Sequence, residues 1–126
     1  MKRILMFAAL AEAGTGVTLL AFPAIVVRLL FDAEIVGAGV IVSRIAGIAL
    51  IGLGVACWPN TSVRPSLYGM MTYGTLAALY LISVGVRGQA VGVLLWPAVA
   101  AHAVLLALLL YARFKERTNH VDGMRA

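Results

Sequence analysis

The chain has 126 residues, of which 63% are hydrophobic and only 12% are charged, and its mean hydropathy is +1.02. Soluble domains carry about 25% charged residues, so this composition excludes an ordinary soluble domain and predicts one membrane domain over 1–114. The net charge of +5 does not indicate nucleic-acid binding, because the basic residues flank apolar segments instead of forming one stripe. The single cysteine, Cys57, excludes an intrachain disulfide, and we expect it to behave as a small hydrophobic residue.

The first predicted helix covers about 4–31 and is interrupted by Glu12 and Arg28. Pro23 lies inside it and removes one backbone donor, so the pattern predicts a kinked helix. The basic start and the Ala-Glu-Ala sequence at 11–13 also fit a signal peptide, but the apolar run resumes directly afterwards. We therefore expect an uncleaved first helix.

The second predicted helix covers 35–58 and has one charge, Arg44, near its middle. The stretch exceeds the roughly 20 apolar residues that are needed to cross ~30 Å of hydrocarbon. An arginine at that depth is costly unless it faces protein, water or a counter-ion. Glu12 is its chief available partner, so the sequence predicts a buried Glu12–Arg44 ion pair between the first two helices.

Two further helices are predicted at 66–86 and 90–114. Pro65 suits a first helical turn, whereas Pro97 lies inside the last helix and predicts a kink there. The tail, 115–126, is polar and is expected to fray or be disordered. The short connections make consecutive helices antiparallel, which predicts an all-α, up-down-up-down four-helix bundle.

Basic residues are distributed unevenly between the two sides of this topology. The excess on one side predicts that both termini lie in the cytoplasm and that the protein is multi-pass in the cytoplasmic (inner) membrane. Seven basic residues fall on the predicted cytoplasmic side, Lys2, Arg3, Arg64, Arg113, Lys115, Arg117 and Arg125, and two on the other, Arg28 and Arg87.

The polar residues that fall at mid-depth define one candidate site. They form a buried cluster that is either structural or a path for a proton or ligand: Glu12, Arg44, Tyr73, Tyr80 and His102. The structural interpretation is an ion pair that joins helices, completed by hydrogen bonds from the other members. His102 alone could ligate haem, but no second histidine lies within a predicted span, which disfavours bis-histidine ligation.

Motifs for catalysis, nucleotide binding or metal binding are absent from the sequence, so we expect no catalytic residue, metal or cofactor. The segment G-x-x-L-L-x-x-P-x-x-V-x-x-L-L-F at 16–31, followed by R-x-x-G-x-x-L-x-x-L-G at 44–54, resembles small bacterial four-helix membrane proteins of the DoxX-like type. The resemblance implies a fold and no particular activity.

The sequence therefore supports three hypotheses on function. The first is a non-catalytic membrane protein that acts as an oligomer or as an accessory or assembly subunit beside larger membrane partners. The second is a small proton-coupled transporter or channel that uses Glu12, Arg44 and His102. The third is a lipid- or quinone-binding redox accessory, which would need a cavity between Tyr73, Tyr80 and His102.

Overall fold

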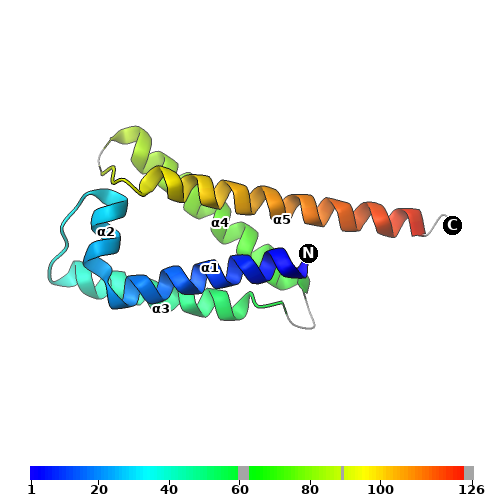
Figure 1. Ribbon diagram of the computed structural model, residues 1–126, viewed down its shortest axis with the longest axis horizontal. Helices are drawn as coiled ribbons and strands as arrows, with labels where there is room; N and C mark the ends of the chain where they lie inside the picture. The colour runs from blue at the N-terminus through cyan, green and yellow to red at the C-terminus, as the bar shows by residue number, and fades with distance from the viewer. Residues whose placement is uncertain (60–62, 89, 124–126) are drawn as a thin grey trace.

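The computed structural model describes all of the chain except residues 60–62, 89 and 124–126, and describes side chains as far as Lys115. The described residues form five helices and no strand (Figure 1). In chain order these are α1 (Lys2–Ala21), α2 (Pro23–Phe31), α3 (Ala38–Ala56), α4 (Val63–Arg87) and α5 (Leu95–Gly123).

Four of the described helices are long and apolar enough to cross a membrane: α1, α3, α4 and the part of α5 that ends at Lys115. Each of these segments has between 19 and 25 residues, and about 20 residues suffice for a ~30 Å hydrocarbon core. The described residues thus confirm an all-helical chain with four helices that are long and apolar enough to span a membrane.

The segment from 4 to 31 forms two helices, so the prediction of one kinked helix is wrong. Phe22 leaves the helical conformation, with φ −129° and ψ 56°, and Pro23 begins α2. A residue before proline disfavours the helical region, and proline itself suits a first turn because it needs no amide partner there. The chain therefore ends α1 and restarts in a new direction, and α2 lies across the axis of α1 in Figure 1.

Close contact between α1 and α3 depends on glycine. Gly47 sits against backbone atoms of Gly16 and Leu20, and Gly54 sits against backbone atoms of Ala9 and Ala13. A Cβ would lie 2.7 Å from a backbone oxygen of α1 at Gly47 and 2.6 Å from another at Gly54. A larger residue at either position would therefore push the helices apart. Because lipid tails give helices little hydrophobic reason to associate, such close backbone approach is a main source of attraction.

The start of α5 differs from the prediction, because the helix begins at Leu95 instead of 90. Pro97 therefore lies in the first turn, where a missing amide costs no intrahelical bond, and the predicted kink is unnecessary. At the other end the backbone stays helical to Gly123, so the predicted frayed tail is helical over most of its length. The side chains of 116–126 lie outside the described residues.

A backbone joint connects α2 to the segment before α5. The amides of Gly92 and Leu94 donate to the carbonyls of Leu30 and Leu29, at 3.0 and 2.8 Å. These carbonyls belong to the last turn of α2, which has no helical partner for them. A Cβ at 92 would overlap with the Leu29 carbonyl, so this contact requires glycine.

The main apolar core lies where α1, α4, α5 and the end of α3 meet. Arg113 closes the same region by stacking its guanidinium over the ring of Tyr68, 4.9 Å from the ring centroid. The fully buried members of this core are Leu5, Ala8, Ala9, Cys57, Leu67, Met70 and Leu109. As expected, Cys57 packs there as a small hydrophobic residue, with 3% of its surface exposed.

Candidate functional site

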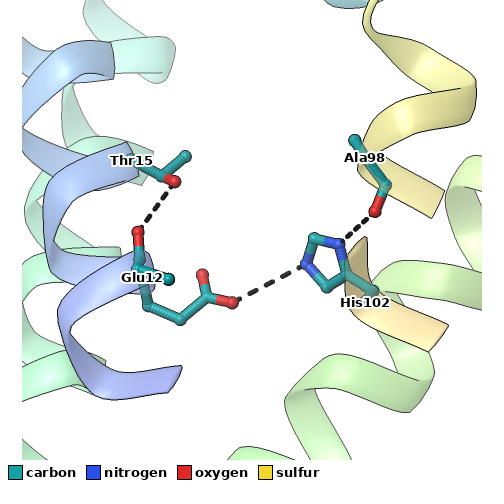
Figure 2. Close-up of polar contacts among 5 residues, drawn as sticks. Glu12, Thr15, Ala98 and His102 are labelled. Atoms are coloured by element: carbon teal, nitrogen blue, oxygen red, sulfur yellow. Dashed lines mark hydrogen bonds and ion pairs between the residues drawn. The ribbon is translucent and has the colours of Figure 1, made fainter. Parts of the chain in front are cut away.

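Glu12 and His102 form the polar centre of the molecule. Glu12 lies ten residues after Lys2, about 15 Å along α1 and hence near the middle of that helix. Only 6% of its surface is exposed. Its Oε1 faces Nε2 of His102 on α5 at 3.7 Å (Figure 2). The site thus joins the first and last described helices.

The proton positions of the pair follow from a second contact of His102. Its Nδ1 lies 2.8 Å from the Ala98 carbonyl oxygen, one turn earlier in α5 (Figure 2). A carbonyl can only accept, so Nδ1 must carry a hydrogen. Nε2 then faces Glu12 either as a bare lone pair or as the second N–H of a charged imidazolium. A single proton shared by Nε2 and the carboxylate keeps the pair neutral as a whole.

Tyr73 adds a contact from α4. Its side chain lies near the Glu12 carboxylate, and its ring lies 6.2 Å from the His102 ring, centroid to centroid, tilted by 52°. The structure thus brings Glu12, Tyr73 and His102 together. Three helices supply one member each, so the site links α1, α4 and α5.

A small cavity of about 10 Å³ opens beside the pair. It is lined by Glu12, Met70, Gly74, His102, Leu105, Leu106 and Leu109. Its volume is about what one water molecule needs. Nε2 of His102 is completely buried and has no hydrogen-bond partner within the described chain, since 3.7 Å is too long for a hydrogen bond to Glu12.

Arg44 lies outside this site, and the predicted Glu12–Arg44 ion pair is wrong. Gly54 contacts residues 9 and 13 of α1, so it lies at the same height along the helix pair as Ala11. Because α1 and α3 are antiparallel, Glu12 lies at the height of residue 53 of α3. Arg44 lies nine residues from that level, or ~13 Å along the helix axis. Its side chain is exposed, and the same register places it level with the end of α1.

Tyr80 is also separated from the other predicted members, with 67% of its surface exposed. The seven-residue spacing places Tyr73 and Tyr80 on nearly one face of α4, but α4 runs obliquely to α1 in Figure 1. Two helices that cross obliquely stay in contact for only a few turns. One tyrosine therefore faces Glu12 while the other lies beyond the crossing.

Sequence reasoning missed two contributors to the site, Ala98 and Cys57. The carbonyl of Ala98 fixes the hydrogen on Nδ1, which a spacing of four residues permits but does not require. Cys57 lies just beyond the end of α3, where burial raises the pKa of its thiol and the nearby Glu12 charge raises it further. Both effects favour the neutral thiol.

The described residues contain no group of three or more side chains that could hold a metal ion. The Glu12–His102 contact itself places a buried acid beside a base with which it can share a proton. Comparison with protein-family models, with curated proteins and with solved structures gave no match. The resemblance to DoxX-like proteins stays a prediction.

Proposed function

We propose that this chain is a non-catalytic, multi-pass membrane protein that acts as an oligomer or as an accessory or assembly subunit. The proposal retains an up-down-up-down arrangement of the four spans in the cytoplasmic membrane, with both termini on the cytoplasmic side. The start of α1 and the end of α5 lie at the same end of the molecule in Figure 1, which supports the placement of both termini on one side of the membrane.

An exposed small-residue face on α3 carries the proposal. Ala49, Gly52 and Ala56 are all exposed, and their spacings of three and four residues place them on one side of the helix. A Cβ at Gly52 would meet no atom within 4 Å. The opposite side of α3 uses glycine to approach α1 closely, and a second helix can approach this face in the same way.

The mass of the particle in a mild detergent tests this proposal. We expect the protein from its native membranes to be larger than one chain of 13.3 kDa plus its bound detergent. Gly52→Leu should reduce the mass to that of a single chain, because the side chain blocks close approach. Gly14→Leu is the matched control, since Gly14 is also an exposed helical glycine with no atom near its Cβ position. A wild-type protein that is a lone monomer would contradict the proposal.

A second candidate function is a small proton-coupled transporter or channel, and the buried Glu12–His102 pair favours it. Ionisable groups inside a membrane often mark a proton path. Arg44 does not take part, because it lies away from the pair. On this proposal Glu12→Gln abolishes pH-linked flux in liposomes while the fold stays intact, and Glu34→Gln, at an exposed loop position, leaves flux unchanged. Wild-type liposomes without flux would remove this candidate.

The third hypothesis, a lipid- or quinone-binding accessory, gains no support from the cavity beside His102. Pockets for small molecules usually enclose about 300–1,000 Å³, whereas this cavity holds about 10 Å³. Tyr80, which the hypothesis places on its wall, is not among the lining residues.

A further inference from the structure

The gap between Glu12 and His102 has the size and polarity of a water site. At 3.7 Å the two atoms are too far apart for a direct hydrogen bond and close enough for one molecule, set off the line between them, to contact both. The adjoining cavity provides about the volume of one water molecule.

The polar groups around the gap provide the partners that a buried water needs, typically two to four. Oε1 of Glu12 is one partner, and the buried Nε2 of His102, which has no other within the described chain, is the second. The Tyr73 side chain also lies near Glu12. The remaining walls of the cavity are apolar side chains and Gly74, so a water there would have a defined orientation.

We propose that one water molecule binds between Oε1 of Glu12 and Nε2 of His102 and makes the pair a proton-exchange site. The protonated carboxyl gives its proton to the water, and the water gives one of its own to Nε2. The products are a carboxylate and an imidazolium, and the water is unchanged. Total charge is the same before and after the transfer, so no net charge is created in the low-dielectric interior.

The groups that face the pair come from every helix packed around it. Tyr73 faces it from α4, with its ring 6.2 Å from the ring of His102, centroid to centroid. Cys57 lies near Glu12 from the end of α3 and is neutral. Nδ1 donates its hydrogen to the Ala98 carbonyl in both states, so only Nε2 gains or loses a proton. This inference does not depend on either proposed function.

Solid-state NMR of the full chain in lipid vesicles tests the inference. With ¹⁵N-labelled histidine, we expect magnetisation to pass from water protons to Nε2 of His102, whereas Nδ1 should show a bonded hydrogen at every pH at which the protein is folded. A His102→Gln variant assigns the signals. Absence of water transfer to Nε2 in the wild type would overturn the proposal.

Gly74→Ala provides the discriminating variant. Gly74 lines the cavity, and a Cβ there meets no atom within 4 Å, so alanine adds a methyl group at the cavity wall without a clash. We expect at least a several-fold loss of water transfer to Nε2, with the Nδ1 signal unchanged. Gly14→Ala, on the exposed surface, should leave both signals as in the wild type. Equal transfer in Gly74→Ala and the wild type would mean that the water does not occupy this cavity, and would refute the assignment.

Discussion

Substitution of Gly47 by alanine tests whether glycine contact holds α1 against α3. A Cβ at this position would lie 2.7 Å from the backbone oxygen of Gly16 and 2.8 Å from the backbone nitrogen of Leu20. Both atoms belong to the backbone of a neighbouring helix, so neither can turn away as a side chain can. The helices themselves must separate.

The size of the effect follows from these distances. Ordinary contact begins at 3.4 Å, so the gap must grow from 2.7 Å by about 0.7 Å. A gap of 0.5–1 Å forfeits about a quarter to a half of the dispersion attraction between the atoms on either side. Overpacking of this kind costs about 1–3 kcal/mol, and the better helix propensity of alanine returns roughly 0.5–1 kcal/mol. The difference between these ranges is a net loss of up to about 2.5 kcal/mol.

The free energy of unfolding can be measured by titrating SDS into mixed micelles and following helix content by circular dichroism. Gly14→Ala is the matched control, because a Cβ at that helical glycine meets no atom within 4 Å. It should gain about 0.5–1 kcal/mol from helix propensity alone. If the two alanine variants had the same stability, the close approach of α1 and α3 would not contribute as argued.

Three other predictions use different measurements. Gly92→Ala should disrupt the joint between α2 and α5 and lower the SDS midpoint, whereas Gly14→Ala should not; equal midpoints would contradict the joint. Either Glu12→Leu or His102→Leu alone should cost about 1–3 kcal/mol, because the buried polar group that remains then faces an apolar side chain. The double variant should be nearly neutral, and additive losses in the same titration would argue against the pair. Because the pKa of Cys57 is raised, its thiol stays protonated as pH rises past ~8.5, where a free thiol ionises. Maleimide labelling of the folded protein should therefore accelerate only at a higher pH than labelling of the SDS-unfolded chain. Identical pH profiles for the two would disprove the raised pKa.

The fold was predictable to the level of apolar segments and no further. Continuous apolar runs and the charges between them indicated four long apolar helices and located α3 and α4 to within three residues at each end, because about 20 apolar residues form a helix that crosses the hydrocarbon core. The break at Phe22 was not predictable in the same way. Pro23 disfavours a straight continuous helix, but it is equally compatible with a kink and with a break. The choice between the two depends on how α2 packs against the segment before α5.

Contacts in the candidate site that depend only on the depth of a residue in its helix could be predicted from the sequence. Contacts that depend on the register between two helices could not. Glu12, Tyr73 and His102 lie near the middle of their helices, so any bundle with these spans brings them to similar height. Counting from residue 35 predicts that Arg44 lies at the depth of Glu12, but the glycine contacts between α1 and α3 set a register in which it lies ~13 Å from that level. Register depends on pairwise packing between helices, which a hydropathy pattern does not contain.

The Glu12–His102 contact also has a consequence for biogenesis. Ninety residues separate the two partners in the chain, and a ribosome that adds about 5–20 residues per second makes the second one roughly 5–20 s after the first. During that interval α1 enters the bilayer with an acid that has no base beside it, and a protonated carboxyl is the cheaper form in lipid. Synthesis of α5 then supplies the missing base, so the first helix reaches its final electrostatic state only when the last one has been inserted.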